Sequence, residues 1–135
     1  MSSEPLPAAT FTYLERATTS LWEAILTDDH TQRYALAHVC ALRTTAAVLA
    51  ARAKPAPKRR RQLNAWVLLA EVAPEFSEWA SFFAAGANKR AAAEAGSRYA
   101  VSEREADDLV RDAERFLTVV ETSLGLEAHP PIRVA

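Results

Sequence analysis

Apolar residues recur every three or four positions along most of the chain, a spacing that places them on one face of an α-helix. The first such stretch predicts a helix over residues 10–27. A second predicted helix begins after a capping aspartate, Asp28 or Asp29, and runs to about Lys54. Because its many alanines let neighbouring backbones approach closely, we expect this helix at the centre of the domain.

The second half of the chain predicts helices separated by proline and glycine. The basic segment 54–61 contains two prolines and should be an exposed loop. A short helix over residues 62–72 should follow, and Pro74 suits the first turn of a helix over residues 75–95. Gly96 is a typical terminator for that helix.

The last predicted helix has the clearest start signal in the chain. Ser102 and Glu105 form a Ser-x-x-Glu capping box, in which each side chain accepts a hydrogen bond from a free backbone N–H. Gly125 should end the helix. Because Pro130 and Pro131 oppose helix formation, we expect residues 126–135 to be extended. The core stripe of the helix would comprise Ala106, Leu109, Val110, Ala113, Phe116, Leu117, Val120 and Leu124.

These patterns predict an all-α protein, an up-and-down bundle of four main helices whose third helix is broken near Pro74. Residues 1–9 are expected to be a flexible N-terminus, residues 10–125 the helical domain and residues 126–135 a tail. Half of the 135 residues are hydrophobic, which suffices for one core without metal or disulfide bonds.

Composition and charge limit the binding partners and the cellular compartment that we expect for this protein. The net charge of -1 provides no overall attraction to nucleic acid or membrane. No secretory signal is recognisable, and no apolar run approaches the roughly 18 residues that a membrane span needs, so we expect a cytoplasmic protein. The single cysteine, Cys40, and three histidines lack metal-ligand spacing, so neither a metal nor a cofactor is expected.

Four features occur in a characteristic order. They are an Arg-Tyr-Ala-x-Ala-His pattern at residues 33–38, a proline-containing loop, an aromatic helix reaching Asn88-Lys89-Arg90, and a Ser-x-x-Glu-Ala helix start followed by Ala113-Glu114-x-Phe116-Leu117. Over roughly residues 10–125 the chain resembles the HEPN superfamily (higher eukaryotes and prokaryotes nucleotide-binding). It is similar in particular to a small stand-alone HEPN family of actinobacteria.

The resemblance implies a helical bundle that often pairs as a homodimer and occurs in RNA-cleaving toxins, nucleotide-transfer modules and inactive partner-binding forms. Ribonuclease members carry an Arg-x4-6-His motif around the last long helix, where Arg90 and Arg98 stand here. The positions five to seven residues after these arginines are Ala95, Gly96 and Ser97, and Glu103, Arg104 and Glu105. None can replace imidazole as a general acid or base, which argues against ribonuclease activity.

Arg33 and His38 match Arg-x4-His literally, and they define the alternative hypothesis, a metal-independent ribonuclease that uses both residues across a dimer interface. Five residues on a helix rotate the side chains by about 140° relative to each other, so the two do not share a face. We therefore favour a structural role for His38, half-buried and bonded to a hydroxyl or carbonyl.

Basic residues cluster in the predicted loop and before the last helix, and could contact the phosphates of RNA or a nucleotide. The candidates are Lys58, Arg59, Arg60, Arg61, Lys89, Arg90 and Arg98. The loop lacks interleaved aromatic residues for base stacking, which favours the simpler interpretation of a solvated loop.

Adjacent Phe82 and Phe83 give the third helix a wider apolar arc than one internal face needs, which predicts a dimer or partner-protein surface. The leading hypothesis is a non-catalytic HEPN-like module that dimerises or binds a partner protein.

Overall fold

The computed structural model describes residues 5–52, 64–97 and 99–132. These residues form helices and, within the described ranges, no strand, which confirms the all-α prediction. In chain order the elements are α1 (Ala8–Leu26), α2 (His30–Arg52), α4 (Ala65–Val72), the 3-10 turn η1 (Pro74–Phe76), α5 (Ser77–Ala85), α6 (Ala87–Glu94) and α7 (Glu103–Ser123).

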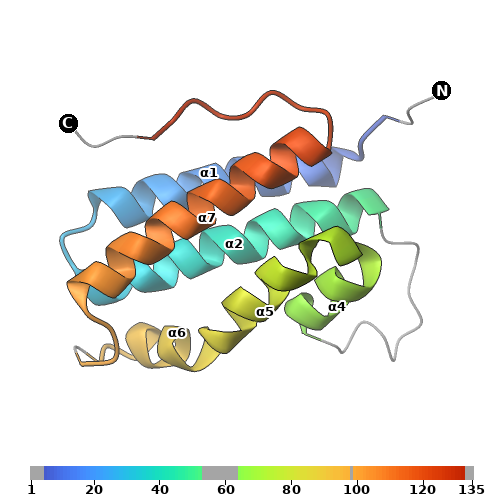
Figure 1. Cartoon of the computed structure of the whole chain (residues 1–135). Coiled ribbons are helices and arrows are strands. Elements are labelled where there is room, and N and C mark those ends of the chain that lie inside the picture. Colours follow the sequence, from blue (N-terminus) through green and yellow to red (C-terminus); the bar gives the residue numbers. More distant parts are fainter. Residues whose placement is uncertain (1–4, 53–63, 98, 133–135) are drawn as a thin grey trace.

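The long helix α2 lies at the centre, as its alanine content predicts. It packs against α1, α7, α6 and α4, and α7 runs across α1 and α2 (Figure 1). By length and composition alone α2 could cross a membrane, although the sequence analysis expected no such stretch. Of the most apolar 18 residues of α2, 56% are buried inside the bundle, as is typical of a central core helix.

Polar caps set the starts of three helices. Asp29 Oδ1 accepts hydrogen bonds from the Thr31 backbone N–H at 2.9 Å and from its hydroxyl at 2.7 Å, at the start of α2. At α7, the capping box of Ser102 and Glu105 is present, with both hydrogen bonds at 3.0 Å. Asn64 caps α4 by accepting from the Val67 N–H at 3.0 Å, so α4 begins at Ala65 rather than at residue 62.

The prediction of a single helix over residues 75–95 is wrong in one respect. In the structure the segment divides at Gly86 into two helices, α5 and α6. In the interior of a helix, glycine is less favourable than every other residue except proline. A Cβ on Gly86 would also lie only 2.8 Å from the Tyr34 hydroxyl of α2. The missing side chain therefore lets the break pack closely against α2.

Two glycines end helices as predicted. Gly96 and Gly125 have φ values of +87° and +79°, in the left-handed region that glycine adopts without strain. After α7, the described residues 126–132 form no helix or strand and fold back alongside α7 (Figure 1). Leu126 and Ile132 pack against the core, so this part of the tail is attached to the bundle.

Candidate functional site

His38 lies inside the aromatic core and is only 1% exposed. Its ring meets Trp66 of α4 and Phe83 of α5 edge-on, with ring centroids 5.6 and 6.1 Å apart. Neither ring nitrogen has a hydrogen-bond partner among the described residues. The expectation of a half-buried histidine bonded to a hydroxyl or carbonyl is therefore wrong, because α4 and α5 surround the ring with apolar side chains.

This surrounding determines the protonation state of His38. Burial, aided by the positive charge of Arg90, lowers the pKa of His38 to about 4. The ring is therefore neutral at pH 7. A general acid or base must reach the substrate and exchange protons near neutral pH, and His38 in this conformation meets neither requirement.

Arg33 is engaged in holding the helices together. Its Nη2 donates to the Thr27 carbonyl at 2.7 Å, its Nε donates to the Ala24 carbonyl at 3.2 Å, and its Nη1 pairs with Asp107 at 2.8 Å. These contacts join α2 to the end of α1 and to α7. No contact between Arg33 and His38 is present among the described residues, so the structure does not bring the Arg-x4-His pair together.

The predicted basic surface is described only in part, because Lys58, Arg59, Arg60, Arg61 and Arg98 lie outside the described residues. Lys89 forms an ion pair with Glu105, and Arg90 Nε donates to Glu94 at 3.0 Å. The pair with Glu105 raises the pKa of Lys89. Both described members of the basic set are thus matched by a carboxylate, which weakens their attraction for phosphate.

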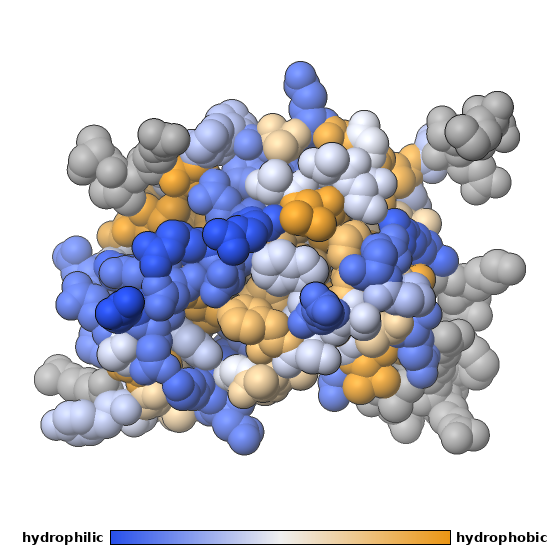
Figure 2. Space-filling model, in the orientation of Figure 1, coloured by the Kyte–Doolittle hydropathy of each residue, from blue (hydrophilic) through white to orange (hydrophobic). Residues whose placement is uncertain are grey.

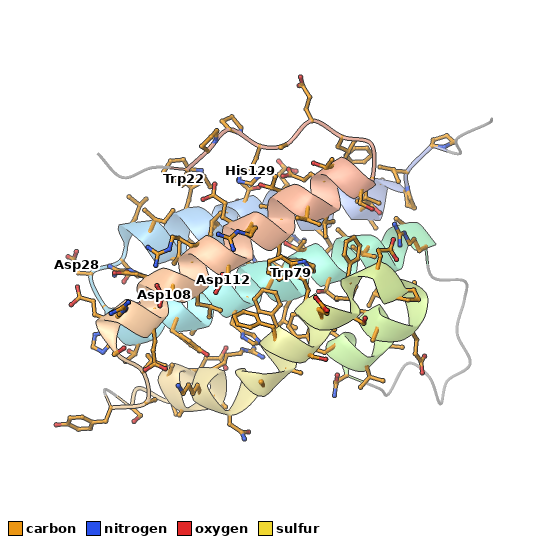
Figure 3. All side chains as sticks on the ribbon, in the orientation of Figure 1. Trp22, Asp28, Trp79, Asp108, Asp112 and His129 are labelled. Atoms are coloured by element: carbon orange, nitrogen blue, oxygen red, sulfur yellow. The ribbon has the colours of Figure 1, made fainter. Side chains whose placement is uncertain are left out.

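A groove between α5 and α7 contains the apolar surface that the sequence predicted. Phe82 is 48% exposed, whereas neighbouring Phe83 is 1% exposed. The groove has a volume of about 360 Å³, and Trp79 lies at its α5 side, facing α7 (Figure 3). On this face of the molecule, hydrophobic residues gather near the middle between hydrophilic ones (Figure 2). The groove is lined by Glu78, Trp79, Phe82, Asp112 and Arg115.

Charged groups beside these aromatics have no partner in the described chain. Glu78, Asp112 and Arg115 make no hydrogen bond or ion pair with another described residue. Burial raises the pKa of the Asp112 carboxyl, and the negative charge of Asp108 adds to that effect while Arg115 opposes it. The groove therefore offers two carboxylates and one guanidinium next to exposed aromatic surface.

A second ionisable cluster, centred on His129, was missed by the sequence analysis. The His129 ring is 7% exposed and lies between two glutamates of α7, with Nδ1 2.6 Å from Glu121 Oε1 and Nε2 3.0 Å from Glu114 Oε2. Burial lowers the pKa of His129, but the hydrogen bonds and charges of the glutamates outweigh it, so the pKa is raised. The seven-residue spacing of the glutamates places them on one helix face, but the return of the tail has no local sequence signal.

Cys40 is buried, as expected for a packed thiol, and burial raises its pKa to about 12. Within residues 5–52, 64–97 and 99–132, no group of three His, Cys, Asp or Glu side chains could hold a metal ion.

Comparison with known proteins identifies the family. A family model of HEPN domains, HEPN_SAV_6107, matches residues 24–121. This segment includes α2, α4, α5, α6 and most of α7. Comparison with curated proteins and with solved structures gives no match. The matched segment spans most of the chain, and the chain therefore belongs to this HEPN family.

Proposed function

We propose that this protein is a non-catalytic HEPN module that acts by docking through the groove between α5 and α7. The observation that carries the proposal is the exposed Phe82 beside Trp79, flanked by charged side chains that have no partner in the described part of the chain. Aromatic residues at the centre of a surface with a polar rim are typical of protein interfaces.

The absence of catalysis is inferred from the two residues that a ribonuclease would need. His38 is sealed between Trp66 and Phe83, and its pKa of about 4 leaves it neutral. The guanidinium of Arg33 is already used by Ala24, Thr27 and Asp107. Neither group is available to bind or protonate a phosphodiester.

A second copy of the chain suits this groove best. In a two-fold symmetric interface the same patch meets itself, so each charge needs an opposite charge within the patch. Arg115 lies in the same groove as Asp112 and Glu78, and none of the three forms an ion pair with another described residue. Two facing copies would pair Arg115 of each with the carboxylates of the other while burying Phe82.

Light scattering over a concentration series tests this proposal. Phe82→Glu should weaken self-association at least about 30-fold, the loss typical of a central interface residue. Phe11→Glu is a matched control, because Phe11 is 47% exposed on α1, outside the groove. Arg115→Glu should also weaken association, and adding Asp112→Arg should restore part of it. A monomer at all concentrations that also binds no partner protein would refute the proposal.

The alternative is a metal-independent ribonuclease that uses Arg33 and His38 across a dimer interface. Its support is the literal Arg-x4-His spacing. RNA cleavage by purified wild-type protein that is lost in both Arg33→Ala and His38→Ala, with the fold retained, would favour this alternative. Equal RNA cleavage by wild type and His38→Ala would remove it.

Contact with RNA or a nucleotide through basic residues is a separate hypothesis. Its support is the cluster Lys58, Arg59, Arg60 and Arg61 in the sequence. Such binding should weaken steeply with salt and be largely lost when these four residues become serine. Binding that does not respond to salt, or no binding, would reject it.

A further inference from the structure

The described part of the C-terminal tail, residues 126–132, is held against the bundle at its first and last residues. Leu126 and Ile132 are partly buried and packed on the core. Between them the chain borders a hollow of about 780 Å³, whose other wall includes Glu114 and Thr118 of α7. Residues 126–132 therefore run back along α7 as a strap (Figure 1), and the hollow borders most of this strap.

Glu114 and Glu121 fasten the strap through its backbone and through one side chain. The His129 N–H donates to Glu121 Oε1 at 3.2 Å, and the Ile132 N–H donates to Glu114 Oε2 at 3.0 Å. The same two oxygens receive the two nitrogens of the His129 ring. One imidazole thus lies at the centre of a four-bond attachment.

For both ring nitrogens of His129 to donate hydrogen bonds to the glutamates, the imidazole must be protonated. A protonated imidazole carries an N–H on both nitrogens and can donate to Glu121 and Glu114 together. A neutral imidazole has only one N–H, so its other nitrogen would present a lone pair to a carboxylate about 3 Å away, which repels it. Loss of the ring proton therefore breaks one attachment and leaves two carboxylates without a cation.

The charges that act on His129 are those of Glu121 and Glu114. From α2, Cys40 lies within electrostatic reach of both glutamates, but its thiol is neutral. Arg43 of α2 is held by the Ser20 hydroxyl at 2.7 Å and the Arg16 carbonyl at 3.2 Å.

We propose that residues 126–132 form a proton-controlled strap, fastened while His129 is protonated and released when it loses its proton. Release uncovers the part of the core that Leu126 and Ile132 cover. The strap is separate from the α5–α7 groove, so this inference stands independently of the proposed function.

Amide hydrogen exchange of the full chain, followed by NMR from about pH 6 to pH 9, tests the strap. The His129 and Ile132 amides should lose protection by about tenfold or more beyond the rise seen in an unstructured peptide of the same sequence. The loss should follow the titration of the His129 ring, with a midpoint above the ordinary value of 6.5. Unchanged protection, or a ring midpoint at or below 6.5, would overturn the proposal.

Three variants sharpen the experiment. His129→Gln should leave the Ile132 amide unprotected throughout the pH range. Glu121→Gln removes one carboxylate and should move the midpoint of release to lower pH, which a purely structural role would not do. Glu127→Gln is the control, because Glu127 is an exposed glutamate of the same strap that makes none of the four bonds. Release in Glu127→Gln equal to that in His129→Gln would contradict the mechanism.

Discussion

His38 and His129 are both buried, yet their environments have opposite effects on their charge. His38 is enclosed by Trp66 and Phe83 with no hydrogen-bond partner among the described residues, and its pKa is lowered to about 4. His129 lies between Glu114 and Glu121, and its pKa is raised. Burial disfavours the charged ring at both sites, so the difference comes from the two carboxylates at one of them.

The two histidines therefore give stability in opposite pH ranges. Because the pKa of His38 is lowered on folding, its contribution is full above 6.5 and is lost as the pH falls toward about 4. Because the pKa of His129 is raised, its contribution is full below 6.5 and is lost as the pH rises through the raised value. One histidine suits the core only when neutral, and the other holds the tail only when charged.

The largest effect is expected at about pH 4, when His38 is replaced by an apolar side chain of similar size. His38→Leu removes two buried ring nitrogens that lack partners, so the free energy of unfolding should rise by about 1–3 kcal/mol at pH 7. At about pH 4 the gain should be roughly 3 kcal/mol larger, because the wild type must then protonate a buried ring. Urea unfolding at both pH values measures this, and a destabilised variant would show that His38 has a polar role.

Truncating Phe83, whose ring packs against His38, should have the next largest effect. Phe83 is 1% exposed and contacts His38, Trp66 and Phe116, so Phe83→Ala should lower the free energy of unfolding by about 3–5 kcal/mol. The pKa of His38 should rise toward 6.5 as water reaches the ring. Urea unfolding and NMR titration of the ring measure the two effects. A His38 pKa that stays near 4 would contradict the assignment of burial as the main cause.

A smaller effect is expected at the other histidine. Glu121→Gln should lower the free energy of unfolding by about 1–2 kcal/mol at pH 6, where the His129 ring is charged, and by less at pH 9. Thermal or urea unfolding at both pH values measures the difference. Equal losses at the two pH values would mean that Glu121 contributes through packing rather than through the protonated ring.

The smallest effect concerns Arg90, whose charge is the secondary cause of the low pKa of His38. Arg90 pairs with Glu94 and is partly exposed, so solvent and the carboxylate screen it. Arg90→Gln should raise the pKa of His38 by less than about half a unit. Lys89→Gln is the control and should leave the pKa of His38 unchanged. A larger shift in either variant would mean that charge, rather than burial, controls the His38 ring.

Much of the fold could be predicted from short-range patterns. Ser102 with Glu105, Gly96 and Gly125 act within one turn of helix, so their effects are visible in neighbouring residues. The division at Gly86 was not predicted, and the close approach of the Tyr34 hydroxyl to Gly86 comes from a helix far away in sequence. The start of α4 was misplaced because the capping role of Asn64 was not recognised.

The candidate sites were less predictable than the helices. Phe82 was correctly associated with surplus apolar surface, since two adjacent phenylalanines cannot both face one core. The bonding of His38 was predicted wrongly, because α4 and α5 decide what surrounds it. His129 was overlooked, because its partners Glu114 and Glu121 lie 15 and 8 residues away in sequence.

By itself the sequence determined that the chain is helical, where most helices begin and end, and that no histidine follows Arg90 or Arg98 at the spacing of a HEPN ribonuclease. These properties depend on local hydrogen bonding and periodicity, which neighbouring residues specify. Only the tertiary structure decided which histidine is neutral and which is charged. A pKa depends on the groups that surround a side chain in space, and here those groups come from other helices and from a tail that folds back.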